Sequence, residues 1–191
     1  MKKILVVVDM QNDFIDGALG TPEAQAIVSN IVKKLENCPD KEETLLLYTK
    51  DTHYKNYMDT LEGEKLPVPH CIENTEGWCI NKQISSVGDN GGFLGFSSNK
   101  IINSRIYKNT FGSEDLYELL KTYKDTIEQV EFVGVCTSIC VLSNAIMARM
   151  ALPDTKILVD ANCCACVTPE THKAALMSMK QCQIDVIGDE E

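Results

Sequence analysis

The fold of this chain is decided by one stretch, Val130-Glu131-Phe132-Val133-Gly134-Val135-Cys136-Thr137-Ser138-Ile139-Cys140-Val141-Leu142-Ser143-Asn144-Ala145. It begins as an apolar run with β-branched residues that Gly134 closes, a pattern typical of a buried β-strand. Thr137 and Ser138 are good helix caps, and a helical pattern follows them to about Met150. The stretch therefore predicts a strand, a turn and a helix in direct succession.

Cys140 falls in the first turn of the predicted helix. The positive end of the helix dipole stabilises a thiolate at this position, and the unpaired N–H groups of the same turn could hold a developing oxyanion. The segment thus offers a nucleophile and a cradle for a transition state. The alternative interpretation is a small cysteine that is buried on a core helix.

Composition and charge restrict the class of protein. The chain has 191 residues, of which 44% are hydrophobic and 24% charged, as expected for one soluble globular domain over residues 1–191. A net charge of −10 argues against nucleic acid or an anionic membrane as a partner. No apolar run approaches the length of a membrane span, and the sequence lacks the pattern of a signal peptide. We expect a cytoplasmic protein.

Nine cysteines are present, and their odd number and the expected cytoplasmic location predict reduced thiols. The cluster of Cys163, Cys164 and Cys166 is interpreted as small buried side chains. The alternative, a structural zinc site, would need a second pair of ligands at zinc-finger spacing.

Strands and helices alternate along the rest of the chain. Apolar runs predict six strands, at residues 4–9, 44–49, 104–107, 130–134, 156–159 and 183–187. Thr21-Pro22 and Thr168-Pro169 are helix starts, and helices are also expected at about residues 113–123 and 137–150. Residues 10–20 are expected to be a loop, and residues 52–104, which include Gly91-Gly92, a long irregular segment. The alternation predicts an α/β three-layer sandwich with a mostly parallel, roughly six-stranded sheet.

Three reactive side chains stand at the carboxyl ends of different predicted strands: Asp9, Lys108 and Cys140. These ends gather at one edge of a parallel sheet, where ligands bind. A carboxylate can take the proton of a thiol and deliver it to a leaving amine, and a lysine ammonium lowers the pKa of the thiol. The alternative is a solvated ion pair of Asp9 and Lys108.

A second cluster follows the second strand and contains Asp51, His53, Glu62 and His70. Two imidazoles and two carboxylates form a reasonable set of ligands for a divalent transition metal. Asp51 and His53 are two residues apart, so both can reach one ion from an extended chain. The alternative is an ordinary group of surface histidines beside acids.

Three segments resemble a known family. Residues 7–14, Val-Val-Asp-Met-Gln-Asn-Asp-Phe, resemble the opening DxQxDF motif of the isochorismatase-like cysteine hydrolases, which include the nicotinamidases. Residues 134–141, Gly-Val-Cys-Thr-Ser-Ile-Cys-Val, resemble their G-V-x-T-x-x-C-V nucleophile motif. Tyr107-Lys108, with Phe111-Gly112 and Asp115-Leu116 after it, resembles their lysine segment. The similarity runs in order through nearly the whole chain.

The resemblance implies a catalytic triad of Cys140, Asp9 and Lys108. It also implies a cis peptide between Val135 and Cys136, with the amides of Cys136 and Cys140 as the oxyanion hole. Metal ligands map onto Asp51, His53 and His70, in a region where the nicotinamidases bind zinc or a similar ion. Zinc is the ion we expect, with manganese or iron as alternatives; the fourth ligand is Glu62 by spacing, and the alternatives are Asp59 and Glu64.

The residues expected around the substrate are Gln11, Phe14 and Trp78. One departure concerns the position three residues before His70, where nicotinamidases usually carry an aromatic residue that stacks on the pyridine ring. This chain has Pro67 there.

The sequence and the resemblance together predict a cysteine-dependent, metal-assisted amidohydrolase. Its expected reaction is hydrolysis of nicotinamide to nicotinate and ammonia through a thioester, a step of NAD salvage, in a homo-oligomer. One alternative is a metal-free cysteine hydrolase acting on another small amide or on isochorismate, which the two histidines and two acids disfavour. Another is a binding protein of the same fold without turnover.

Overall fold

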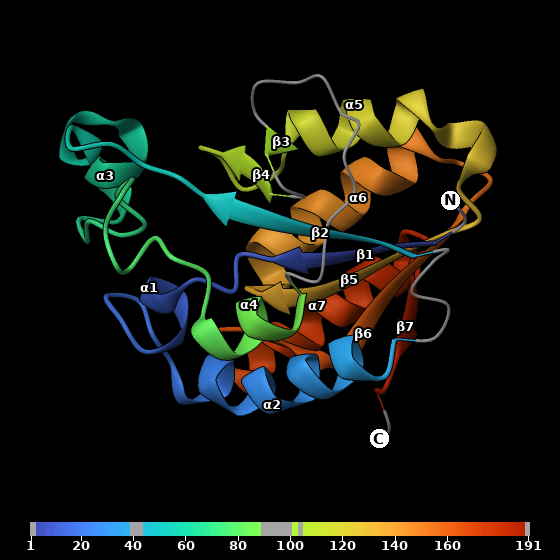
Figure 1. The fold of residues 1–191 in the computed structure, drawn as a ribbon, viewed down its shortest axis with the longest axis horizontal. Helices are drawn as coiled ribbons and strands as arrows, with labels where there is room; N and C mark the ends of the chain where they lie inside the picture. The colour runs from blue at the N-terminus through green and yellow to red at the C-terminus, as the bar shows by residue number, and fades with distance from the viewer. Residues whose placement is uncertain (1–2, 39–43, 89–100, 103–104, 190–191) are drawn as a thin grey trace.

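The computed structural model describes residues 3–38, 44–88, 101–102 and 105–189, and its centre is one sheet (Figure 1). The strands are β1 (Lys3–Val8), β2 (Thr44–Asp51), β3 (Ile101–Ile102), β4 (Arg105–Lys108), β5 (Gln129–Val135), β6 (Lys156–Ala165) and β7 (Asp185–Ile187). Their order in the sheet is β3-β4-β2-β1-β5-β6-β7. Six strands are parallel, and the two-residue β3 pairs antiparallel with β4 at one edge. The predicted mostly parallel α/β sheet is confirmed.

Helices cover both faces of the sheet, which makes the three predicted layers. The α-helices are α1 (Asn12–Ile15), α2 (Pro22–Glu36), α3 (Leu61–Lys65), α4 (Lys82–Gly88), α5 (Glu114–Thr122), α6 (Leu142–Ala151) and α7 (Pro169–Gln181). Two short 3₁₀ helices, η1 (Tyr57–Asp59) and η2 (Lys124–Thr126), and a π-helix, η3 (Thr137–Val141), complete the set. Among the residues described, no helix combines the length and the apolar character that crossing a membrane requires.

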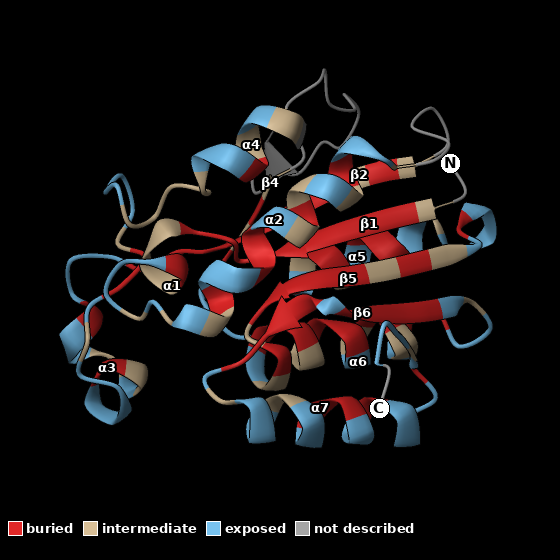
Figure 2. Cartoon of the chain, turned by 90° about the horizontal axis from the view of Figure 1, so that it is seen from below, coloured by how far each residue is buried: buried red, intermediate tan, exposed pale blue. Residues whose placement is uncertain are grey.

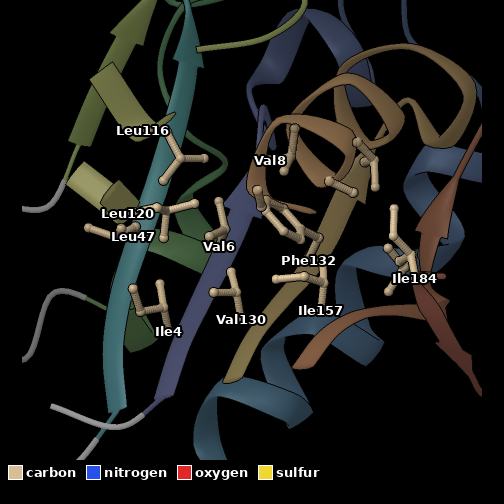
Figure 3. Close-up of a cluster of buried hydrophobic side chains, with 14 of the residues drawn as sticks. Ile4, Val6, Val8, Leu47, Leu116, Leu120, Val130, Phe132, Ile157 and Ile184 are labelled. Atoms are coloured by element: carbon tan, nitrogen blue, oxygen red, sulfur yellow. The ribbon is translucent and has the colours of Figure 1, made fainter. Parts of the chain in front are cut away.

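The central strands carry side chains into two separate cores. Alternate residues of β1 point to opposite faces, so that Ile4, Val6 and Val8 join the core under α5, α6 and α7 (Figure 3), whereas Leu5 and Val7 join the core under α2 and α4. This two-sided burial explains the unbroken apolar runs of the sequence. Figure 2 shows that β1, β5 and β6 are largely buried while the surrounding helices expose their outer sides.

Both helix starts that were predicted from a cap followed by proline are present. The Thr21 side chain accepts a hydrogen bond from the Ala24 amide at the start of α2, and Thr168 caps α7 in the same way through Thr171. The buried face of α2 is an apolar stripe of Ala24, Ile27, Val28, Ile31 and Leu35.

The structure corrects several expected boundaries. Residues 10–20 are not all loop, because α1 forms within them, and the segment 52–104 contains η1, α3, α4 and β3. Such short elements have too few turns to produce a hydrophobic period in the sequence. Strand β6 continues to Ala165 and so includes part of the cysteine cluster, and β7 begins at Asp185. Ser104 and the Gly91-Gly92 pair lie outside the described residues.

Removal of a central core side chain tests this packing. Phe132 on β5 is fully buried, and we expect Phe132→Ala to lower the free energy of unfolding by about 3–5 kcal/mol because it leaves a cavity. Phe111→Ala makes the same change at a side chain that is 51% exposed, and we expect an effect within about 0.5 kcal/mol. Urea denaturation followed by circular dichroism measures both. Equal losses in the two variants would contradict the placement of the core.

Candidate active site

The strand order brings four side chains of the predicted catalytic and metal sites together at the carboxyl edge of the sheet. Asp9 follows β1, Asp51 ends β2, Lys108 ends β4 and Cys140 follows β5, and these four strands are neighbours. Lys108 Nζ lies 2.7 Å from Asp9 Oδ2, 3.5 Å from Cys140 Sγ and 3.5 Å from Asp51 Oδ1. The ammonium group therefore stands at the centre of the cluster.

The cluster is buried. Asp9 has no exposed surface, and Lys108 and Cys140 are 6% and 7% exposed. The interpretation of Asp9 and Lys108 as a solvated ion pair is therefore wrong. Cys140 lies in the hydrophobic core, as the alternative interpretation of this residue expects. Its sulfur also lies 3.5 Å from the Lys108 ammonium group.

Burial sets the protonation of the nucleophile. It raises the pKa of Cys140 well above its usual value, and the Asp9 carboxylate adds to this, so that together they outweigh the lowering by Lys108. This direction is opposite to the one expected from the helix dipole, and burial is its main cause. Complete burial also raises the pKa of Asp9 despite the nearby ammonium. We infer a thiol whose proton can pass to a carboxylate that is ready to accept it.

The Asp9 carboxylate is held by a residue that the sequence did not indicate. The Thr49 hydroxyl donates to Asp9 Oδ1 at 2.6 Å and accepts from the Asp9 amide at 3.2 Å. Thr49 lies two positions before Asp51 on β2, so the two side chains point to the same face of the sheet. This two-residue spacing is the signal that could have identified it.

A glycine permits the close approach of β5 to the residue before Asp9. Gly134 has φ of +120°, and a Cβ atom at this position would lie 2.1 Å from the backbone oxygen of Val8. A side chain here is therefore excluded both by conformation and by space. This constraint places the turn that carries Cys140 beside the end of β1.

The nucleophile turn differs from the expected α-helix. Residues Thr137–Val141 form a π-helix, with the Val141 amide donating to the Cys136 carbonyl at 3.1 Å, and α6 begins only at Leu142. Short π segments are frequent at functional sites. The peptide between Val135 and Cys136 is cis, as the resemblance implies.

Two side chains outside the predicted set support this turn. Asn144 donates to the carbonyls of Cys140 at 2.8 Å and Phe111 at 3.1 Å, and it accepts from the Ser113 amide at 3.0 Å. It thereby ties the loop after Lys108 to the nucleophile. His172 of α7 shares a hydrogen bond of 2.8 Å with the Thr137 hydroxyl.

The predicted metal ligands converge beside the triad. Ligand atoms of Asp51, His53 and His70 all lie within 4.8 Å of one another. Asp51 Oδ2 is 2.9 Å from His53 Nε2 and 3.5 Å from His70 Nε2, and Glu62 Oε1 is 3.6 and 3.8 Å from the same nitrogens. Glu62 therefore faces the imidazoles.

The surroundings of the two histidines suit a metal ion. His70 Nδ1 is 2.8 Å from the Val68 carbonyl, a contact that fixes the other ring nitrogen as the one free to bind. The rings of Tyr57 and Phe14 pack against His70, with centroids 5.1 and 5.4 Å away. The two alternative fourth ligands, Asp59 and Glu64, are both exposed.

Asp51 belongs to both clusters, since Oδ1 faces Lys108 and Oδ2 faces the histidines. Burial by itself would raise the pKa of this carboxyl, but Lys108 and the two imidazoles hold it well below its usual range. Asp51 is thus ionised at neutral pH, as a metal ligand needs to be.

Gln11 and Trp78, two of the residues expected around the substrate, make contacts within the protein. The Gln11 amide contacts the carbonyls of Asp51 at 2.8 Å and Trp78 at 3.0 Å and accepts from the Asp51 amide at 2.7 Å, so it holds β1 and β2 together. The Trp78 indole donates to Thr52, and the Lys50 ammonium lies 2.9 Å from its ring centroid. A role of Gln11, Phe14 and Trp78 in substrate binding stays a prediction.

Comparisons with known proteins agree with this arrangement. Residues 3–191 match the family model of the isochorismatase domain. Nicotinamidase from Saccharomyces cerevisiae is 26% identical over 97% of this chain and 99% of its own length. The crystal structure of a nicotinamidase from Bacillus subtilis superimposes with a TM-score of 0.77 at 27% identity, covering 97% of this chain and 99% of that one. A "probable inactive nicotinamidase" from Arabidopsis thaliana is 25% identical over 92% of this chain and 87% of its own length.

The buried ion pair predicts a loss of stability when one partner is removed. We expect Lys108→Met to lower the free energy of unfolding by roughly 3–5 kcal/mol, because it leaves the Asp9 carboxylate buried without its counter-charge. In a double-mutant cycle, adding Asp9→Asn should cost less than the sum of the single changes. Lys121→Met, in an exposed pair with Glu118, should change stability by less than about 1 kcal/mol. Additive effects of Asp9→Asn and Lys108→Met in urea denaturation would contradict the pairing.

The ligand set predicts one divalent ion per chain. We expect isothermal titration of chelator-treated protein with Zn²⁺ to give one site, and His70→Ala to weaken binding at least about 100-fold, since a first ligand is lost. Glu62→Gln should weaken binding, whereas the matched change Glu64→Gln, at an exposed acid two positions along α3, should not. Equal affinities for the Glu62 and Glu64 variants would exclude Glu62 as the fourth ligand.

Proposed function

The chain belongs to the isochorismatase family, and on that premise we propose that it is a cysteine-dependent, metal-assisted amidohydrolase that converts nicotinamide to nicotinate and ammonia. Hydrolase activity follows from the family; the cysteine mechanism, the metal and the substrate are the proposal. The observation that carries it is the buried Lys108 ammonium, 2.7 Å from Asp9 and 3.5 Å from the Cys140 sulfur. A buried nucleophile, a base and a fixed positive charge are the parts that covalent hydrolysis of an amide requires.

In the acylation half of the reaction, Asp9 accepts the proton of the Cys140 thiol as the sulfur attacks the amide carbonyl. The raised pKa of Asp9 suits this role, because a more basic carboxylate takes the proton more readily. The C–N bond then breaks, and the proton on Asp9 passes to the nitrogen, so that ammonia leaves and a thioester on Cys140 remains.

In the second half, a water molecule gives a proton to Asp9 while its oxygen attacks the thioester carbonyl. The C–S bond breaks, the acid is released, and the proton on Asp9 returns to the Cys140 sulfur. The balance is one amide and one water consumed, and one carboxylic acid and one ammonia formed.

Lys108 keeps its charge through both halves. Burial would lower its pKa, but Asp9, Cys140 and Asp51 together raise it well above the usual value, so the side chain stays an ammonium. It therefore stabilises negative charge as that charge moves between Asp9 and Cys140. We assign the oxyanion hole to the amides of Cys136, the residue directly before η3, and Cys140, which lies within η3.

Asp51, His53 and His70, with Glu62 as fourth ligand, would hold a divalent ion, for which zinc is the proposal and manganese or iron suit the same donors. When bound, such an ion supplies a Lewis acid that can fix the ring nitrogen of a pyridine carboxamide beside the nucleophile. The Phe14 ring, which packs on His70, is suited to form one wall of the substrate site.

One residue favours a second candidate within the same chemistry. Pro67 is exposed where nicotinamidases usually carry a stacking aromatic residue, so a small amide other than nicotinamide is the alternative substrate. One relative, from Arabidopsis thaliana, carries the name "probable inactive nicotinamidase". The test therefore includes a protein without turnover as a separate outcome. The expected homo-oligomer and cytoplasmic location stay predictions.

Ammonia release from nicotinamide tests the proposal. We expect the zinc-loaded protein to release ammonia, Cys140→Ala to lower the rate at least about 1,000-fold because the nucleophile is lost, and chelator to lower it until zinc is restored. Cys182→Ala removes an exposed thiol as a control and should leave the rate unchanged.

Three results separate the alternatives. Release from a panel of small amides but not from nicotinamide would favour the Pro67 alternative. Turnover that persists in Cys140→Ala would contradict the cysteine mechanism. No turnover of any amide in the panel by the zinc-loaded protein would favour a binding protein.

A further inference from the structure

Two cysteines that the proposed mechanism does not use face each other beside the nucleophile turn. Cys136 follows β5 and Cys166 follows β6, and the last pair of these parallel strands is Val135 with Ala165. The two cysteines are therefore the next residues on adjacent strand ends. Neighbouring strands lie about 4.8 Å apart, which is within the roughly 4.4–6.8 Å between the Cα atoms of a disulfide.

The two side chains are close enough for each to shift the pKa of the other. The Ser138 hydroxyl lies 2.9 Å from Cys166 Sγ. Cys166 is 3% exposed and Cys136 is half-buried, so small oxidants reach the pair from the side of Cys136.

The contacts give the two thiols unequal proton affinities. Hydrogen bonds from Cys136, Ser138 and Thr171 lower the pKa of Cys166 to about 4, although burial opposes them. The same hydrogen bond, together with burial, raises the pKa of Cys136. These directions favour the thiolate on Cys166 and the thiol on Cys136, an arrangement in which the thiolate reacts first.

We propose that Cys136 and Cys166 are an oxidative modification site that closes to a reversible disulfide in the presence of a peroxide and thereby lowers the activity of the neighbouring site. The geometric basis is the position of the two residues side by side, directly after the last register pair of β5 and β6. The expected loss of turnover on oxidation rests on the proposed function, whereas the formation of the disulfide does not.

The chemistry needs a peroxide as oxidant and proceeds in two steps. The Cys166 thiolate attacks one oxygen of hydrogen peroxide, the O–O bond breaks, and a sulfenic acid and a hydroxide ion form. Cys136 then attacks the Cys166 sulfur, its proton leaves with the sulfenic oxygen as water, and the S–S bond forms. Because the sulfenic acid carries no charge, the Cys166 anion no longer raises the pKa of the Cys136 thiol in the second step. A dithiol restores both thiols.

The disulfide would act on the turn that carries the nucleophile. Forming an S–S bond of about 2.05 Å draws Cys136 toward Cys166 at the end of β6, and the Cys136 amide is half of the proposed oxyanion hole. It also weakens the contact of Ser138, in the same π-helix, with Cys166. A shift of about 1 Å in a catalytic group can change the rate about 100-fold.

The other thiols near the site are less suited to this reaction. Burial raises the pKa of Cys163 to about 12 and raises that of Cys164 further. Cys140 is also held as a thiol. The pair is thus the reactive position in this part of the chain.

The test uses purified, fully reduced protein treated with a small excess of hydrogen peroxide at neutral pH, then with N-ethylmaleimide. We expect the intact mass to show the loss of two hydrogens and two fewer alkylated thiols, and non-reducing tryptic maps to show a link between fragments 125–149 and 157–173, assigned by fragmentation to Cys136 and Cys166. Nicotinamide hydrolysis should fall at least about tenfold, and dithiothreitol should restore it.

Variants make the assignment specific. Cys166→Ser keeps a hydrogen-bonding partner for Ser138, and we expect it to form no link and to retain its own starting activity after peroxide. Cys163→Ser, at a buried cysteine of the same strand end, and Cys140→Ala should both still form the link. Cys166→Ala is a second variant if the serine protein does not fold.

Absence of the link, a link through other cysteines, or inhibition that is equal in Cys166→Ser would each overturn the proposal. If the protein does not hydrolyse nicotinamide at all, the proposed function fails, and the mass measurement still decides whether the disulfide forms.

Discussion

The contact on which the rest of the site depends is the ion pair of Lys108 with Asp9, which is buried with the Cys140 sulfur and Asp51 around the same ammonium group. A lysine with so little exposure is stable as a cation only where carboxylates surround it, and a carboxylate as buried as Asp9 needs that cation. The two charges therefore require each other. They also require the four strands that carry the cluster to end at one place.

This requirement accounts for features that lie away from the chemistry. Thr49 fixes the orientation of Asp9, Gly134 lets β5 approach Val8, and Asn144 joins the Lys108 loop to the nucleophile turn. None of these residues carries the chemistry in the proposed reaction. Each removes a degree of freedom from a group that does, which is how a site gains precise geometry.

The sequence predicted what depends on local pattern. The strands, the starts of α2 and α7 and the three residues Asp9, Lys108 and Cys140 follow from apolar runs, caps and the rule that parallel strands share a carboxyl edge. The convergence of Asp51, His53 and His70 also matched a spacing visible in the chain. What the sequence could not provide depends on tertiary contacts. The pKa of Cys140 is raised by burial, which no local pattern measures, and the π-helix around it replaces the expected α-helical turn. The contact of Cys136 with Cys166 depends on the pairing of β5 with β6, whose register appears only in the sheet.

The hydrogen bond between Thr137 and His172 has a consequence for the synthesis of the protein. Strand β1 is made first but lies in the middle of the sheet, and its second neighbour, β5, comes 121 residues after the end of β1 on the chain, from Val8 to Gln129. The support of the nucleophile turn by α7 comes later still along the chain, after β6. A growing chain on the ribosome therefore carries Asp9, Lys108 and Cys140 before His172 can help to lock them in place. The proposed site can assemble fully only after α7 has been made, even if most of the sheet has already formed.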